Sequence, residues 1–127
     1  MSEQHEALPC PLCGAASHWL LDDRKRSYWQ CEQCLMVHVP ACWQLTAEQE
    51  KAEYDRHENH PDDPGYRRFL SRLAEPLLTR LPAAGSGLDF GCGPGPALAM
   101  MLREHGHQVA LHDLYYHPNP DALRQQW

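Results

Sequence analysis

Apolar and polar positions alternate between residues 17 and 30. Residues 18–21 and 27–30 alternate in the manner of paired β-strands, and the charged run 22–26 between them predicts a hairpin turn. A third short strand is predicted over 35–39, where Pro40 ends it. The pattern therefore predicts a small β-structure at this end of the chain.

A helical period replaces the alternation in the middle of the chain. Thr46 and Gln49 have the spacing of a capping box, which predicts a helix over 47–57. A second helix is predicted to begin with Asp63 as its N-cap and Pro64 at its first position. Apolar residues recur along this second helix with a period that places them on one face. They are Tyr66, Phe69, Leu70, Leu73, Leu77 and Leu81.

The last third of the chain reads as strand, helix, strand. A buried strand is predicted to end at Phe90, and glycines occupy positions 91, 93 and 95 directly after it. A helix is predicted over 96–105, with Gly106 ending it, and a second strand over 108–112. Asp113 stands at the end of that strand. This is the opening of a βαβ unit with a glycine turn after its first strand.

Four of the six cysteines form two C-x2-C pairs, Cys10 with Cys13 and Cys31 with Cys34, separated by 17 residues. Each pair offers two thiolates from one tight turn, and four thiolates suit a tetrahedral Zn²⁺ ion with no open position. The pattern predicts a structural zinc site in a zinc ribbon. Two unrelated pairs of buried cysteines are the alternative. Cys42 lies outside the spacing and is expected to be a small buried side chain.

Composition restricts the classes of function. The 127 residues are 43% hydrophobic and 22% charged, with a formal net charge of −6, which disfavours broad nucleic-acid binding. The N-terminus lacks a signal-peptide pattern, and the longest apolar run, 97–102, is too short to span a bilayer. We expect a cytoplasmic protein without a membrane segment, in which cysteines bind metal more often than they form disulfides.

Three ligands compete for the glycine turn. A P-loop is excluded because no Gly-Lys-Ser/Thr follows the glycines. A dinucleotide fingerprint fails because Pro96 and Leu98 occupy the last glycine position in its two registers. A nucleoside without a pyrophosphate remains, with a carboxylate at the end of the second strand to accept hydrogen bonds from ribose hydroxyls.

The stretch Asp89-Phe90-Gly91-Cys92-Gly93-Pro94-Gly95, with Asp113 one strand later, resembles the first motifs of class I S-adenosylmethionine-dependent methyltransferases, which have a Rossmann-like fold. Some members of this superfamily carry a four-cysteine zinc domain before the methyltransferase domain. The resemblance implies an α/β protein in three parts. These are a zinc ribbon over 1–43, a helical cap or connector over 44–82, and a partial Rossmann-like βαβ unit over 83–127.

The resemblance also implies roles for particular residues. Gly91, Gly93 and Gly95 would pass beside the amino-acid portion of S-adenosylmethionine, and Asp89 would fix the loop and the amino group. Asp113 would accept from the ribose hydroxyls, and Leu114 or Tyr115 would border the adenine. The implied reaction is methyl transfer to an unidentified acceptor, with a small molecule favoured. No catalytic residue is identified.

The chain also departs from this family. The family's sheet has seven strands, but only 41 residues follow Ser86, room for two. We therefore expect the N-terminal part of a longer enzyme, inactive by itself, whose exposed sheet is covered by a missing C-terminal half or a partner chain. Two alternatives stay open. One is a zinc-ribbon interaction module without catalytic activity, and the other is an RNA-modifying methyltransferase that uses the basic run 24–26.

Overall fold

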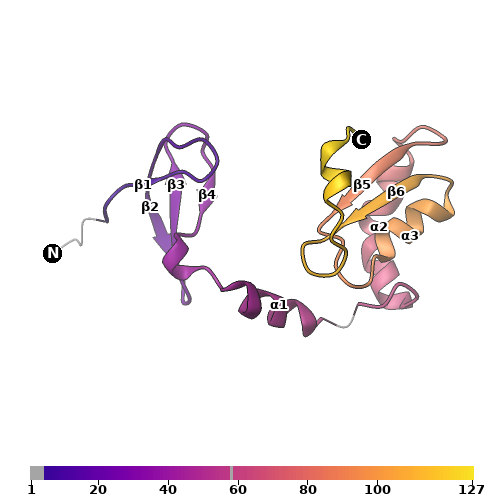
Figure 1. Cartoon of the computed structure of the whole chain (residues 1–127), viewed down its shortest axis with the longest axis horizontal. Helices are drawn as coiled ribbons and strands as arrows, with labels where there is room; N and C mark the ends of the chain where they lie inside the picture. The colour runs from indigo at the N-terminus through magenta and orange to yellow at the C-terminus, as the bar shows by residue number, and fades with distance from the viewer. Residues whose placement is uncertain (1–4, 58) are drawn as a thin grey trace. The chain divides into compact units, whose positions relative to one another are not determined.

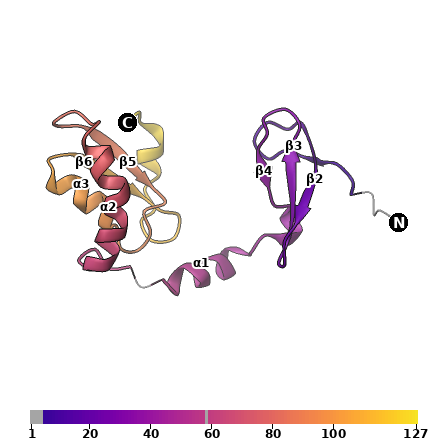
Figure 2. The same cartoon turned by 180° about the vertical axis from the view of Figure 1, so that it is seen from behind.

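The computed structural model describes residues 5–57 and 59–127 of a mixed α/β protein (Figures 1 and 2). The chain divides into two compact units, which are Met1–Glu50 and Lys51–Trp127. The finer division into 1–43, 44–82 and 83–127 stays a prediction. The elements are β1 (Leu8–Pro9), β2 (Ala16–Asp22), β3 (Ser27–Cys31), β4 (Val37–His38), η1 (Ala41–Trp43), α1 (Ala47–Asp55), α2 (Pro64–Leu78), β5 (Ser86–Phe90), α3 (Ala97–Glu104), β6 (Gln108–His112) and η2 (Pro120–Arg124).

The first unit is built on a four-stranded antiparallel sheet in the order β1-β2-β3-β4. The predicted hairpin is confirmed as β2 and β3, which pair from Ser17 opposite Cys31 to Asp22 opposite Ser27. The third predicted strand is shorter than expected, because β4 covers only two residues. Strand β1, which is also two residues long, was not predicted.

Asp23 closes the hairpin turn. Its carboxylate accepts hydrogen bonds from the backbone N–H groups of Lys25 and Arg26 at 2.7 and 2.8 Å, and from the Tyr28 hydroxyl at 2.7 Å. An aspartate that bonds the backbone two and three residues ahead is a typical turn former. Arg24 lies in the same turn, so three consecutive basic residues occupy the tip.

Both predicted helix starts are confirmed. The Thr46 N–H donates to Gln49 Oε1 at 3.0 Å and the Gln49 N–H donates to Thr46 Oγ1 at 3.2 Å, which is a complete capping box. Helix α1 ends at Asp55, two residues earlier than predicted. At the start of α2, Asp63 Oδ1 accepts from the Tyr66 N–H at 2.9 Å, and Pro64 occupies the first position.

The second unit contains a two-stranded parallel sheet, β5 and β6, with α3 between the strands in sequence. The strands pair in register from Ser86 opposite Gln108 to Phe90 opposite His112. Gly106 ends α3 with a φ of +88°, as its position predicts. Helix α3 packs on β6, and α2 packs on α3, so both helices lie on one side of the sheet and η2 lies on the other (Figures 1 and 2).

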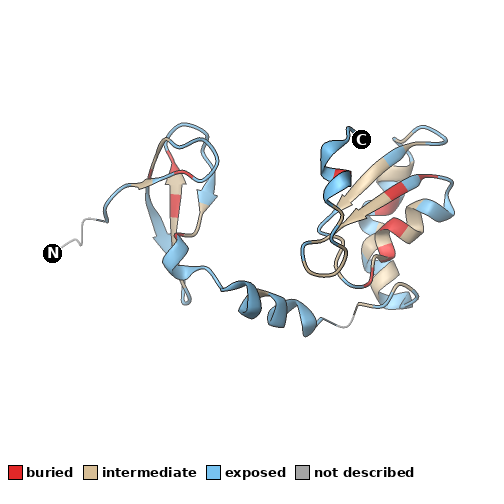
Figure 3. Ribbon diagram, in the orientation of Figure 1, coloured by how far each residue is buried: buried red, intermediate tan, exposed pale blue. Residues whose placement is uncertain are grey.

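The core of the second unit is small. Its buried apolar side chains are Ala74, Ala97, Ala99, Val109 and Ala122 (Figure 3). The expectation of a buried strand ending at Phe90 is wrong, because Phe90 is 72% exposed and the centre of β5 is half-buried. Within the described residues β5 pairs with β6 alone, and a strand with a neighbour on one side only is poorly shielded.

Nowhere in residues 5–57 and 59–127 does a helix combine the length and apolarity that crossing a bilayer requires.

The N-cap of α2 gives a direct test of the second unit. Replacing Asp63 by alanine removes the acceptor of the Tyr66 N–H, and we expect the unit to lose about 1 kcal/mol of unfolding free energy. Urea unfolding followed by the amide signals of α2 measures this. Asp62→Ala is the matched control, since the Asp62 carboxylate lies 3.9 Å from His60 Nδ1 and the backbone N–H that donates to the same atom at 3.2 Å stays in the variant. Equal stability of the two variants would contradict the assignment of the cap.

Candidate metal centre and glycine turn

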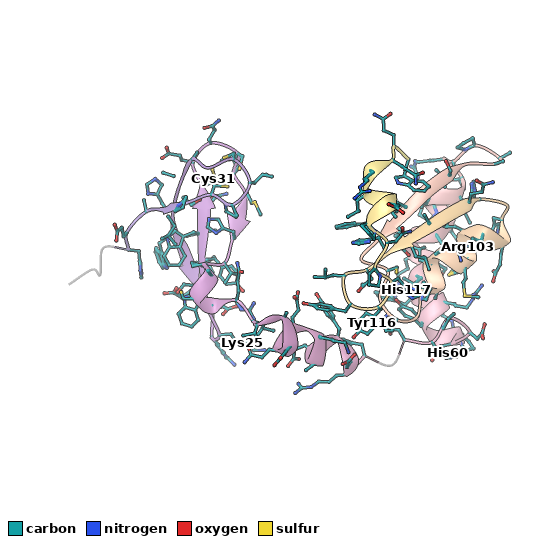
Figure 4. The ribbon with its side chains drawn as sticks, in the orientation of Figure 1. Lys25, Cys31, His60, Arg103, Tyr116 and His117 are labelled. Carbon is teal, nitrogen blue, oxygen red and sulfur yellow. The ribbon has the colours of Figure 1, made fainter. Side chains whose placement is uncertain are left out.

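Four sulfur atoms converge at one end of the first unit's sheet (Figure 4). The Sγ atoms of Cys10, Cys13, Cys31 and Cys34 all lie within 4.8 Å of one another. Two close approaches join one pair to the other: Cys10 to Cys34 at 3.6 Å and Cys13 to Cys31 at 3.5 Å. A tetrahedral Zn²⁺ with bonds of about 2.3 Å separates its sulfur ligands by about 3.8 Å. The cluster therefore has the dimensions of a four-thiolate metal centre and could hold a metal ion such as zinc.

The two turns that carry these cysteines share one backbone conformation. In the first, the Cys10 N–H donates to the Ala15 carbonyl at 2.8 Å, and in the second, the Cys31 N–H donates to the Met36 carbonyl at 2.9 Å. The residue after each pair is left-handed: Gly14 has a φ of +79° and Leu35 a φ of +64°. Glycine adopts this conformation freely, whereas a leucine pays about 1–2 kcal/mol in steric strain. The second turn therefore has the same conformation as the first despite the steric strain at Leu35.

Backbone N–H groups of the turns control which thiols ionise. The N–H of Cys13 lowers the pKa of the Cys10 thiol. The N–H groups of Cys34 and Gln33, each 3.4 Å from Cys31 Sγ, hold the pKa of that thiol at about 6. For Cys34, the Met36 N–H acts in the lowering direction, but burial and the other cysteine side chains raise its pKa to about 12. Metal binding must displace the remaining protons, so metal affinity falls as the pH falls.

The other two cysteines stand outside this cluster. All six cysteines are free thiols. Cys42 lies in η1 and is exposed, so the expectation that it is buried is wrong. Helix η1 has only three residues, none of them buried, so it has no buried face on which Cys42 could lie. Cys92 follows β5 in the second unit, where burial raises the pKa of its thiol to about 11, and such a thiol is a poor nucleophile at neutral pH.

In the second unit, the ends of β5 and β6 bring the glycine turn beside Asp113. Because Phe90 pairs with His112, the two strands finish together. The N–H of Gly91 donates to the His112 carbonyl at 2.7 Å, and the N–H of Gly93 donates to Asp113 Oδ2 at 2.9 Å. The turn is thus fastened directly to the carboxylate that the sequence singles out.

Asp113 also organises the loop that follows it. Its Oδ1 accepts from the N–H groups of Tyr115 at 2.9 Å and Tyr116 at 3.1 Å. Burial acts to raise the pKa of Asp113, but the N–H groups of Tyr115, Gly93 and Tyr116 outweigh it and hold the pKa below its usual value. The carboxylate is therefore ionised at neutral pH.

The three glycines of the turn serve different ends. Gly91 and Gly93 have φ values of +77° and +69°, and a Cβ on either would meet no atom within 4 Å. They are needed for backbone conformation, and the space beside them is open. Gly95 is buried, and a Cβ there would lie 1.8 Å from the Asn59 carbonyl oxygen. Contact with the chain at Asn59 accounts for that glycine without a ligand.

The remaining residues of the predicted site lie around the turn. Asp89 is half-buried, and burial followed by the charge of Asp113 raises the pKa of its carboxyl group. It borders an apolar cavity of about 230 Å³ between α2, β5 and α3. Leu114 is 71% exposed, and Tyr115 is half-buried beside it.

Sequence reasoning missed the contacts that the end of α1 makes with this loop. The Tyr116 hydroxyl donates to the Asp55 carboxylate, which raises the pKa of Tyr116 to about 12. Lys51 Nζ lies 5.3 Å from the centre of the Tyr116 ring, and the ring centres of Tyr54 and Tyr115 are 6.4 Å apart. The two adjacent tyrosines that follow Asp113 in the sequence are the signal that could have indicated these contacts.

No profile of a known protein family matches this chain, and comparison with curated proteins finds no significant match.

Removing one sulfur atom tests the metal centre. We expect purified protein to retain about one zinc ion per chain, and Cys34→Ser to retain far less after dialysis against a chelator, because three thiolates and a hydroxyl bind zinc more weakly than four thiolates. Metal analysis by atomic emission measures both. Cys42→Ser is the matched control and should retain its zinc. If the two variants lose zinc equally, or if neither variant loses zinc, the result would argue against the assigned ligands.

Proposed function

We propose that the Lys51–Trp127 unit is the S-adenosylmethionine-binding part of a methyltransferase. The observation that carries this proposal is the glycine turn that follows Asp89 and is hydrogen-bonded to the carboxylate of Asp113. A ligand could come close to the backbone of the turn, because the space beside Gly91 and Gly93 is open. The α/β arrangement of β5, α3 and β6, which would form a partial Rossmann-like unit, agrees with such a site.

The charge at the turn selects among nucleoside ligands. Burial raises the pKa of the Asp89 carboxyl group, and the negative charge of Asp113 raises it further, so the two carboxylates interact electrostatically. Neither carboxylate pairs with a lysine or arginine side chain in the part of the chain that the structure describes. Such a turn repels the phosphates of a nucleotide and attracts a cation. S-adenosylmethionine has a sulfonium and an ammonium group, which suits this negative environment.

Asp113 has limited capacity for the ribose. A carboxylate offers about four acceptor positions, two on each oxygen. Tyr115 and Tyr116 occupy those of Oδ1, and Gly93 occupies one on Oδ2. One position on Oδ2 is left, so Asp113 would accept from one ribose hydroxyl while the turn keeps its present hydrogen bonds. Asp89 would face the amino group, and Leu114 and Tyr115 would border the base.

When bound, S-adenosylmethionine supplies an electrophilic methyl group, and methyl transfer depends chiefly on how the acceptor is positioned. The residues described above would bind and orient the cofactor. No side chain among them is assigned a role in proton transfer. The net charge of −6 makes a small-molecule acceptor more suitable than a nucleic acid, and a cytoplasmic location stays part of the proposal.

A second candidate is a protein-interaction module built on the first unit. The observation that favours it is the pair of exposed leucines beside the cysteine cluster, Leu12 at 71% and Leu35 at 66% exposure. Leu35 keeps its exposed side chain in a strained backbone conformation, which is more common at functional positions than elsewhere. This role requires no cofactor, so the binding experiment below separates the two candidates.

Selective ¹⁵N-glycine labelling makes a sharp test, because the chain has eight glycines. We expect S-adenosylhomocysteine, titrated to millimolar concentration, to shift the amide signals of Gly91 and Gly93 and to leave Gly14 unchanged. ATP should cause no such shift, since the carboxylates repel its phosphates. Asp113→Asn should weaken the binding by about tenfold or more, the usual effect of losing a hydrogen bond to a charged group.

Asp121→Asn is the matched control, because Asp121 is an exposed residue of η2 whose side chain pairs with Arg124 at 3.4 Å, away from the turn, and this variant should bind like the unmodified protein. Unchanged turn signals with S-adenosylhomocysteine, or equal shifts with ATP, would refute the cofactor proposal and favour the interaction module.

A further inference from the structure

The first unit buries a hydroxyl group that has no hydrogen-bond partner. Ser17 of β2 is 0% exposed, and its Oγ bonds to no atom in the described part of the chain. An unpaired buried hydroxyl is destabilising, because it has lost its hydrogen bonds to water without gaining others. A group in this position therefore calls for an acceptor close by.

The register of the sheet identifies the nearest candidate. Ser17 lies directly opposite Cys31 in the β2–β3 pairing, and Cys31 is also 0% exposed. Side chains directly opposite on antiparallel strands project from the same face, with their Cβ atoms about 4.5–5.5 Å apart. Rotation about χ1 from one staggered position to another can turn the serine hydroxyl toward the side chain on the opposite strand. The hydroxyl of Ser17 and the sulfur of Cys31 therefore share one buried layer.

His38 supplies the other unpaired buried atom of this kind, its Nε2. His38 pairs with Trp29, which is two residues before Cys31 on β3. It lies on the same face of the sheet but one row further from the cysteines. The register therefore favours Ser17 over His38 as a partner of Cys31.

Metal binding changes the sulfur from a weak acceptor to a strong one. A protonated thiol accepts hydrogen bonds poorly, whereas a metal-bound thiolate carries negative charge. Cys31 Sγ already receives the N–H groups of Gln33 and Cys34, so its surroundings favour the charged form. A hydroxyl donor would add to the same stabilisation from the opposite strand.

We propose that Ser17 is a positioning residue of the metal centre, whose hydroxyl donates a hydrogen bond to Cys31 Sγ when the four cysteines hold a metal ion. The inference rests on the metal centre described above. The bond would fix the orientation of the Cys31 side chain and keep charge on its sulfur, and so slow the release of the metal. Groups that orient metal ligands commonly change metal affinity by 10–100-fold when they are removed.

Two variants of equal shape isolate the hydroxyl. Ser17→Thr keeps it, and Ser17→Val replaces it by a methyl group, so any disturbance from the larger side chain is common to both. With Co²⁺ as the bound ion, we expect Ser17→Val to bind about tenfold more weakly than Ser17→Thr and to lose the metal to a chelator correspondingly faster. Its sulfur-to-cobalt charge-transfer band should also move to longer wavelength, because the thiolate becomes a stronger electron donor.

Ser27→Ala is a control within the same sheet. Ser27 is on the same strand and face as Cys31, but its hydroxyl interacts with the Asp22 carboxylate. This variant should match the unmodified protein in affinity, release rate and spectrum. A change in Ser27→Ala as large as in Ser17→Val would mean that the effect belongs to the sheet as a whole and would overturn the proposal.

The unmodified protein gives an independent measurement. In the Zn²⁺-loaded form, the Ser17 hydroxyl proton should exchange slowly enough with water to be observed by NMR, with contacts to the Cys31 side chain. Equal cobalt affinity, release rate and spectrum in Ser17→Thr and Ser17→Val would overturn the role of Ser17 alone. Failure of the unmodified protein to bind Co²⁺ or Zn²⁺ through four thiolates would instead overturn the metal centre itself.

Discussion

The first unit depends on the convergence of four sulfur atoms from two turns. Its buried side chains in the described residues include Cys10, Ser17, Trp29 and Cys31, and two of these belong to the cysteine cluster. A unit of this size buries little apolar surface, and small domains commonly rely on a metal for this reason. The strained turn at Leu35 adds a local cost that a bound metal would offset. Metal binding and folding are therefore expected to be coupled here.

In the second unit, one carboxylate has a comparable structural role. Asp113 joins the glycine turn to the loop after β6 through three backbone N–H groups. The same loop reaches the end of α1 through Tyr116 and Asp55. A small change in this carboxylate would therefore alter both the proposed cofactor turn and the segment that precedes α2. Because Asp113 serves both the structure of the loop and the proposed binding, the binding experiment compares S-adenosylhomocysteine with ATP on the unmodified protein and does not rely on the Asp113→Asn variant alone.

The sequence predicted what depends on spacing along the chain. The paired cysteines, the capping box at Thr46, the N-cap at Asp63 and the helix end at Gly106 each use residues only a few positions apart, so local pattern was sufficient. It failed where contacts come from distant segments. The exposure of Cys42 and Phe90, the contact of Gly95 with Asn59 and the bond from Tyr116 to Asp55 depend on which surfaces meet. The unpaired hydroxyl of Ser17 became visible only with the strand register.

The most direct test of the metal centre is X-ray absorption at the zinc edge of the purified protein. The account predicts a single shell of four sulfur atoms at about 2.3 Å, with no nitrogen or oxygen ligand. A shell that contains nitrogen or oxygen, or fewer than four sulfur atoms, would contradict it.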